Sequence, residues 1–447
     1  MPSSNPGVVP PPPALMRRVT LAAAIGNTVE TYDYAVYGFL TVMLSKLFFP
    51  VAQPGVALLS AFAVFGVAFV IRPLGSLMFG SIADRAGRKP ALVATLVLMA
   101  GATVAIGLLP TAASIGIWAP ILLVACRLLQ GLAAGGEYGT AMTYAAEFTP
   151  QRRRGAMTSR VQIGSVVSLL LAAGIVLLLS ATLTPAAMAS WGWRIPFLLA
   201  LPLGLVGLYI RARLDESPEF RALEQQAEVT SSPAKESFTK HWRLIVLIFG
   251  VAAFQQIGYY VAFTYAQSYI IQLGFTQAQA TLATVISIAV AVVLVAIGGP
   301  LSDRWGRWPM LFGLSAGTLV FAYPIFVGLS SATSLGMVIL MTVSLGVLPA
   351  LYTSVAPATY VEVLPARVRA TVFAVGFALA AALLGGPALY ISQTLVQITG
   401  DSRAPALLLM FGALVSLVAA LFVRRRQPRT LVPDIAVTAG ERSHEGV

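Results

Sequence analysis

Stretches of roughly 20 apolar residues recur along the whole length of this 447-residue chain. A helix of that length crosses the ~30 Å hydrocarbon core of a bilayer. Charged residues make up only 10% of the sequence, whereas a soluble domain contains about 25%. The chain is therefore predicted to be an all-α membrane protein that crosses the bilayer many times.

The apolar stretches predict twelve transmembrane helices in two groups of six. The longest polar segment, residues 214–241, separates the two groups and is predicted to be a cytoplasmic linker. The flanking parts are a disordered cytoplasmic N-terminus (1–16), two six-helix bundles (17–213 and 242–425) and a cytoplasmic tail (426–447). The predicted spans are 19–42, 57–82, 91–110, 117–146, 156–181, 193–212, 242–271, 277–300, 309–331, 334–361, 370–397 and 404–423.

The basic residues indicate how the chain is oriented. The formal net charge is +12, and most of the 29 Lys and Arg residues fall in the predicted cytoplasmic segments. This bias follows the positive-inside rule and places both termini in the cytoplasm. Because membrane topology explains the positive charge, we expect the partners to be the lipid bilayer and small molecules rather than nucleic acid.

Two short motifs occur once in each half of the chain. The sequence DRAGRKP (84–90) recurs as DRWGRWP (303–309), and EFTPQRRRG (147–155) recurs as EVLPARVRA (362–370). Both repeats have nearly the same offset, which indicates two pseudo-symmetric halves. Parallel repeats of this kind are typical of transporters with a substrate site midway between the halves.

These motifs resemble those of the major facilitator superfamily. GSLMFGSIADRAGRKP (75–90) and GPLSDRWGRWP (299–309) are similar to its loop motif. GNTVETYDYAVYG, RLLQGLAAGGEYGTAMTYAAE, WGWRIPF and LDESPEF resemble the metabolite:proton symporter family, which includes bacterial proline/betaine, α-ketoglutarate, shikimate and citrate transporters. The resemblance covers about residues 17–425 and implies the major facilitator fold, but it does not name a substrate.

Charged residues inside the predicted spans suggest a proton-coupling site. Counting ~1.5 Å per residue from the predicted inner face places several of them around the membrane midplane. Three acids and two arginines would leave one surplus negative charge, and burial favours the protonated form of a carboxyl group. One acid is therefore predicted to take up and release a proton. The five residues are Glu30, Asp33, Arg72, Arg127 and Glu137.

The resemblance to sugar-porter relatives implies that Asp33 pairs with Arg127 and that protonation breaks this pair. We predict that Asp33 is the proton site, with Glu137 or Glu30 as competitors. An alternative is that these charges form a static ion-pair network that only holds the helices together.

The substrate is predicted to bind between the two halves. Arg72 is the preferred anchor because two arginines inside the membrane favour a small carboxylate. The second half is nearly uncharged within its spans and offers amides and aromatic rings instead, although each of these can also serve in helix packing. The other candidate binding residues are Tyr37, Gln130, Tyr138, Gln255, Gln256, Tyr259, Tyr260 and Tyr352.

Charged motifs at the predicted cytoplasmic face are candidate gating elements. Asp84 and Asp303 follow helices, and each can pair with arginines or with a helix N-terminus of the other half. Glu147 with Arg154 and Glu362 with Arg369 are predicted salt bridges that open in one access state. The remaining members of the set are Arg85, Arg88, Arg304 and Arg307.

Together these features predict a proton-coupled symporter of the bacterial cytoplasmic membrane that imports a small organic acid by alternating access. A zwitterion such as proline or betaine is the alternative substrate, and an uncoupled facilitator or exchanger of the same fold is the alternative mechanism. With two histidines, one cysteine (Cys126) and no Walker A motif, we expect neither an enzyme nor a metal or cofactor. We also expect a monomer.

Overall fold

The computed structural model describes residues 13–49, 54–75, 78–79, 88–135, 138, 142, 151–212, 241–364 and 369–424. Within these ranges the secondary structure is helical, with no strand. The predicted linker and most of the two predicted tails lie outside the described residues.

In its described residues the first half contains six helical segments, and two of them are interrupted. A short turn separates α5 from α6 in the fourth segment, and the 3₁₀ turn η1 (Gln151–Arg153) precedes α8. A π-helical turn, η2, interrupts the sixth segment. The bounds are α1 (Pro13–Phe48), α2 (Pro54–Val70), α4 (Arg88–Leu108), α5 (Ala112–Ile115) leading into α6 (Trp118–Ala133), α8 (Arg154–Thr182), α9 (Pro185–Ala187), η2 (Met188–Gly192), α10 (Arg194–Leu198) and α11 (Ala200–Ala212).

The second half also has six helical segments in its described residues, and π-helical turns interrupt two of them. These turns, η3 and η5, lie in the seventh and eleventh segments of the chain. The bounds are α14 (Trp242–Tyr260), η3 (Val261–Tyr265), α15 (Ala266–Gln272), α16 (Gln277–Trp305), α17 (Arg307–Ser330), α18 (Leu335–Val363), α19 (Arg369–Ala380), η5 (Ala381–Gly385), α20 (Ala388–Thr399) and α21 (Pro405–Arg424).

These helices correspond to the predicted spans. Nine helices in the described part are long and apolar enough to cross a membrane, and two shorter apolar helices, Val93–Leu108 and Trp118–Ala133, lie between them. Together with α1 they match the twelve predicted segments. The prediction of an all-α membrane protein with two six-helix bundles is confirmed.

Several helix ends differ from the prediction, among them the start of α1 and the end of α6. α1 begins at Pro13, inside the segment predicted to be disordered, because proline suits the first helical position and Ala14, Leu15 and Met16 favour helix. α6 ends at Ala133, whereas the predicted span continues to residue 146. Most of the residues after 135 in that span lie outside the described residues.

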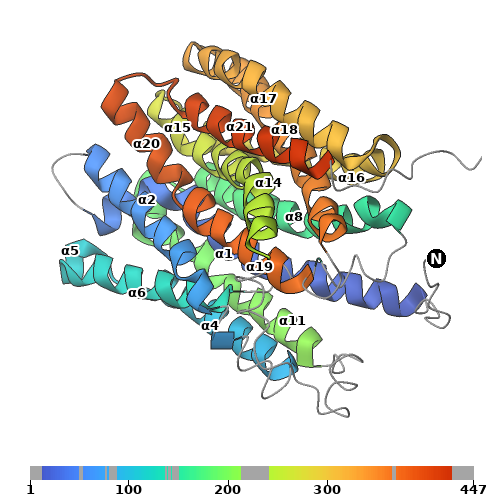
Figure 1. The fold of residues 1–447 in the computed structure, drawn as a ribbon. Helices are drawn as coiled ribbons and strands as arrows, with labels where there is room; N and C mark the ends of the chain where they lie inside the picture. The colour runs from blue at the N-terminus through green and yellow to red at the C-terminus, as the bar shows by residue number, and fades with distance from the viewer. Residues whose placement is uncertain are drawn as a thin grey trace, which may run out of the picture.

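The helices run roughly along one direction, and the two halves touch at both ends of the bundle (Figure 1). α8 makes its most extensive contacts with α16 of the other half. A Cβ atom added to Gly155 would lie only 2.6 Å from the carbonyl oxygen of Gly299, so these backbones meet directly. Near the opposite end, α2 lies beside η5 and α20, where a Cβ on Gly66 would lie 3.3 Å from the Gly386 oxygen. The space between these two contacts holds the candidate site.

Candidate functional site

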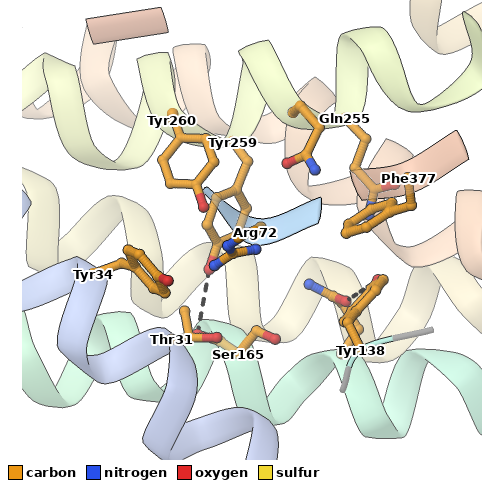
Figure 2. Close-up of a pocket in the computed structure, with 11 residues that line it drawn as sticks. Thr31, Tyr34, Arg72, Tyr138, Ser165, Gln255, Tyr259, Tyr260 and Phe377 are labelled. Carbon is orange, nitrogen blue, oxygen red and sulfur yellow. Dashed lines mark hydrogen bonds between the residues drawn. The ribbon is translucent and has the colours of Figure 1, made fainter. Parts of the chain in front are cut away.

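A pocket lies between the two halves of the molecule (Figure 2). The first half contributes side chains from α1, from the helical turn after α2, from position 138 and from α8. The second half contributes side chains from α14 and α19. The lining residues are Thr31, Tyr34, Arg72, Tyr138, Gln162, Ser165, Gln255, Gln256, Tyr259, Tyr260 and Phe377.

Arg72 is the cationic residue among the described residues that line the pocket, and no acidic residue occurs among them. Its guanidinium carbon lies 4.5 Å from the ring centroid of Tyr34 and 4.5 Å from that of Phe69. Cation–π contacts of this kind hold the guanidinium by its faces. The N–H groups of the guanidinium lie in its plane, where a carboxylate can accept two parallel hydrogen bonds from them.

Aromatic rings form much of the remaining lining. Tyr259 and Tyr260 meet edge to face, with centroids 5.4 Å apart, and Tyr260 packs in the same way on Phe69 at 5.3 Å. Across the pocket, Tyr138 stacks on Phe377 at 4.4 Å, which joins the two halves. Aromatic faces attract cations, and cages of such rings bind quaternary ammonium groups.

Hydrogen bonds fix the orientation of three of these side chains. The Tyr138 hydroxyl donates to Oε1 of Gln162 at 2.9 Å. The Tyr259 hydroxyl donates to the backbone carbonyl of Ser165 at 3.4 Å and so connects α14 to α8. Gln255 accepts a hydrogen bond from the hydroxyl of Tyr360 on α18. The polar lining is thus pre-organised by contacts both within and between the halves.

A second arginine lies behind the pocket, inside the first half. Arg127 has no exposed surface and donates to Gln130 Oε1 at 2.9 Å and to the Phe65 carbonyl at 3.1 Å. Gln130 in turn donates to the Thr103 hydroxyl at 2.6 Å. Asp33 is 1% exposed and interacts electrostatically with Arg127. Asp33 and Arg127 thus place a buried acid near a buried cation, and neither residue belongs to the lining of the pocket.

The structure divides the predicted binding residues into two groups. Tyr37, Gln130 and Tyr352 lie outside the lining of this pocket: Tyr37 donates to the Ala61 carbonyl at 3.0 Å, and Tyr352 donates to the Val251 carbonyl at 2.8 Å, each within its own half. The predicted residues that do line the pocket are Arg72, Tyr138, Gln255, Gln256, Tyr259 and Tyr260. Glu137 and the side chain of Glu30 lie outside the described residues, so their predicted roles stay predictions.

Several lining residues were missed by the sequence reasoning. Thr31 and Tyr34 lie in the motif GNTVETYDYAVYG, and Tyr34 is three positions from the predicted Tyr37, whereas Phe377 lies in an apolar stretch with no distinguishing pattern. Gln162 and Ser165, in contrast, are polar residues three positions apart within the apolar run of α8, and that spacing places them on one face. This signal was available in the sequence.

A charge cluster joins the two halves at the end predicted to be cytoplasmic. The Asp303 carboxylate accepts hydrogen bonds from the backbone N–H groups of Gly155 and Ala156, each at 2.9 Å. These groups belong to the first turn of α8, where the helix dipole also favours a negative charge. Arg307 bridges Asp303 at 2.6 Å and Glu362 at 2.9 Å. We call these three charged residues, with the start of α8, the Asp303 cluster.

The other predicted gating residues have varied positions. Glu362 lies against Arg307, whose side chain reaches it from the start of α17. Its predicted pairing with Arg369 stays a prediction. Arg304 is exposed, and Arg154 is partly buried at the start of α8. The residues Asp84, Arg85 and Glu147, and the side chains of Arg88 and Arg369, lie outside the described residues.

Two bundles of membrane-spanning helices with a polar pocket between them define a secondary transporter. The chain belongs to the major facilitator superfamily and its metabolite:proton symporter family, and the profile of the sugar (and other) transporter family matches residues 19–240 and 221–432. The proline/betaine transporter of Salmonella typhimurium is 37% identical over 427 residues, covering 93% of this chain and 85% of that protein. The family and these relatives are transporters rather than enzymes.

Further comparisons agree with this assignment. The glycine betaine/proline/ectoine/pipecolic acid transporter OusA of Dickeya dadantii is 36% identical, covering 93% of this chain and 85% of that protein. The crystal structure of the proton:xylose symporter XylE with 6-bromo-6-deoxy-D-glucose aligns with a TM-score of 0.74 at 19% identity. That alignment covers 93% of this chain and 96% of the other, and at this identity it shows the fold alone.

Proposed function

We propose that this protein is a proton-coupled importer of a small zwitterion such as proline or betaine, working by alternating access. The observation that carries the proposal is the position of Arg72 beside an aromatic lining that contains no acidic residue in its described part. The substrate carboxylate binds the in-plane N–H groups of Arg72, and its ammonium group rests against the tyrosine and phenylalanine rings.

A zwitterion suits this pocket better than the small organic acid expected first from the sequence. A dicarboxylate needs a partner for its second negative charge, because an unpaired buried charge is costly. Arg127 does not line the pocket, and it already donates to Gln130 and Phe65. The printed substrates of the relatives, which include proline, betaine and ectoine, point in the same direction.

The proton site in this proposal is Asp33. Its carboxylate is buried in α1, one residue before Tyr34 of the pocket lining, and it interacts with Arg127.

Alternating access requires the contacts at each end of the bundle to open in turn. At one end these are the bonds of Asp303; at the other, Gln267 on α15 donates to the Phe39 carbonyl of α1 at 3.2 Å.

Uptake into vesicles containing the purified protein tests the proposal. With an imposed inward proton gradient, glycine betaine and proline should accumulate, and their entry should alkalinise the outer medium. A C4 dicarboxylate should neither accumulate nor compete. Choline, which has the quaternary ammonium but no carboxylate, should compete only weakly. Preferential uptake of the dicarboxylate would overturn the substrate assignment, and equal uptake with and without the gradient would indicate a facilitator.

A further inference from the structure

One tyrosine ring touches both arginines of the first half. The ring centroid of Tyr34 lies 4.5 Å from the guanidinium carbon of Arg72 and 5.2 Å from that of Arg127. Arg72 lines the pocket, whereas Arg127 is buried behind it. Figure 2 shows Tyr34 beside Arg72 in the pocket lining. Because the same ring also contacts the buried Arg127, it lies at the boundary between the pocket and the buried charges.

Neighbouring rings contact one arginine or the other. Phe69 packs on Arg72 at 4.5 Å, whereas Tyr37 and Phe65 pack on Arg127 at 4.5 and 5.3 Å. Tyr34 is also 3% exposed, so its ring is held firmly by its surroundings while still lining the pocket.

We propose that Tyr34 is a positioning residue that couples substrate binding at Arg72 to protonation of the buried Asp33–Arg127 pair. This proposal rests on the proposed function and deepens it. The charged groups that contact the ring are Arg72 after α2 and Arg127 on α6, and Asp33 on α1 acts electrostatically on Arg127. Tyr260 of α14 approaches from the other half through Phe69.

The physical basis is competition between two cations for one ring. A guanidinium group is attracted to the face of an aromatic ring. The two arginines also repel each other. When the substrate carboxylate neutralises Arg72, this repulsion falls, and Arg127 can settle more closely on Tyr34.

Closer contact between Arg127 and Tyr34 draws the guanidinium away from Asp33. The carboxylate then loses part of its counter-charge and accepts a proton from water on the side to which the site is open. By linkage, protonation of Asp33 favours substrate binding by the same factor. This reciprocity is what a symporter requires, because both ligands then move together.

Three variants test the role of the ring. Tyr34→Leu removes the ring, and Tyr34→Phe keeps the ring without its hydroxyl. Phe69→Leu is the matched control: it removes the other ring that packs on Arg72, and the ring of Phe69 has no cation–π contact with Arg127 among the described residues. Each is reconstituted into vesicles and measured in two assays. Counterflow of labelled glycine betaine at equal pH reports binding and translocation, and gradient-driven uptake with simultaneous pH recording reports protons moved per substrate.

Tyr34→Leu should keep counterflow within about fivefold of the wild type, the factor that corresponds to ~1 kcal/mol, but lose gradient-driven accumulation. Tyr34→Phe should retain the wild-type ratio of protons to substrate. Phe69→Leu should raise KM and leave that ratio unchanged. If Tyr34→Leu does not fold, Tyr34→Met, which fills more of the space without a ring, takes its place.

Two outcomes would overturn the inference while leaving the proposed function intact. One is that the Tyr34→Leu variant still accumulates substrate with the gradient and moves the wild-type number of protons per substrate. The other is an equal loss of coupling in Phe69→Leu, which would show that the rings are only platforms for Arg72. Absence of gradient-driven uptake by the wild-type protein would instead overturn the proposed function and, with it, this inference.

Discussion

The Asp303 carboxylate on α16 accepts a hydrogen bond from the backbone N–H of Gly155 on α8, 2.9 Å away and in the other half of the molecule. A second bond from Ala156 and a salt bridge from Arg307 complete its contacts. Because bonds to a carboxylate are about twice as strong as neutral ones, this contact favours the conformation in which the two halves meet at this end.

Asp303→Asn should weaken that contact. The amide can accept only one of the two backbone N–H bonds and loses its attraction to Arg307, a loss on the order of 1.5–3 kcal/mol. We expect faster hydrogen exchange at the start of α8 and a slower transport cycle. Asp401→Asn, which neutralises a partly exposed acid in the loop between α20 and α21, is the control and should leave exchange in α8 unchanged. Unaltered exchange in both variants would contradict the prediction.

Gly155→Ala should separate α8 from α16. The added methyl group would lie 2.6 Å from the Gly299 carbonyl oxygen, and overpacking of this kind typically costs about 1–3 kcal/mol. The expected result is a thermal midpoint lowered by several degrees in detergent. Gly174→Ala, in the same helix but with no atom within 4 Å of the new methyl group, should leave the midpoint unchanged or raise it slightly. Equal behaviour of the two variants would show that the close approach is unimportant.

Arg72→Gln should reduce affinity for substrates that carry a carboxylate. Loss of a charge-assisted pair worth ~1.5–3 kcal/mol corresponds to a roughly 10–100-fold increase in KM for glycine betaine. Arg72→Lys should recover only part of this affinity, because an ammonium group cannot bind a carboxylate in the bidentate manner. Competition by choline, which has no carboxylate, should not weaken in either variant, and it should strengthen in Arg72→Gln because a repelling positive charge is removed. An unchanged KM in Arg72→Gln would place the carboxylate elsewhere.

Asp33→Asn should uncouple transport from the proton gradient. The amide cannot take up a proton at neutral pH, so accumulation and substrate-induced proton movement should both be lost. Counterflow should continue and become insensitive to pH between 5 and 8, since translocation no longer requires a titrating group. If Glu137→Gln or Glu30→Gln produced this phenotype and Asp33→Asn did not, the proton site would be the other acid.

Helix positions could be predicted from the sequence because the hydrocarbon core imposes a local rule. Each span must be about 20 apolar residues long whatever its neighbours are, so the ends of α16 to α21 could be predicted within a few residues. The π-helical turns could not be predicted in this way. η3 and η5 adjoin Tyr260 and Gly386, where helices of the two halves meet closely.

The sequence predicted only in part which side chains face the pocket. Tyr34 and Tyr37 are three positions apart on α1, and the sequence does not say which one lines the pocket. The structure places Tyr34 in the lining, together with residues of α8 and α14, and buries Tyr37, whose hydroxyl donates to the Ala61 carbonyl of α2. In the same way, the contact of Glu362 with Arg307 was not predicted, because it depends on α17 beginning beside the end of α18.

The sequence by itself determined the class of fold, the two repeated halves and the identities of the charged residues placed in the membrane. These follow from hydropathy, spacing and the free energy of burying charge, which act on each segment separately. Only the tertiary structure decided that Arg72 faces the pocket while Arg127 lies behind the ring of Tyr34. That division depends on how α1, α2 and α6 rotate as they pack, and packing is a property of several helices at once.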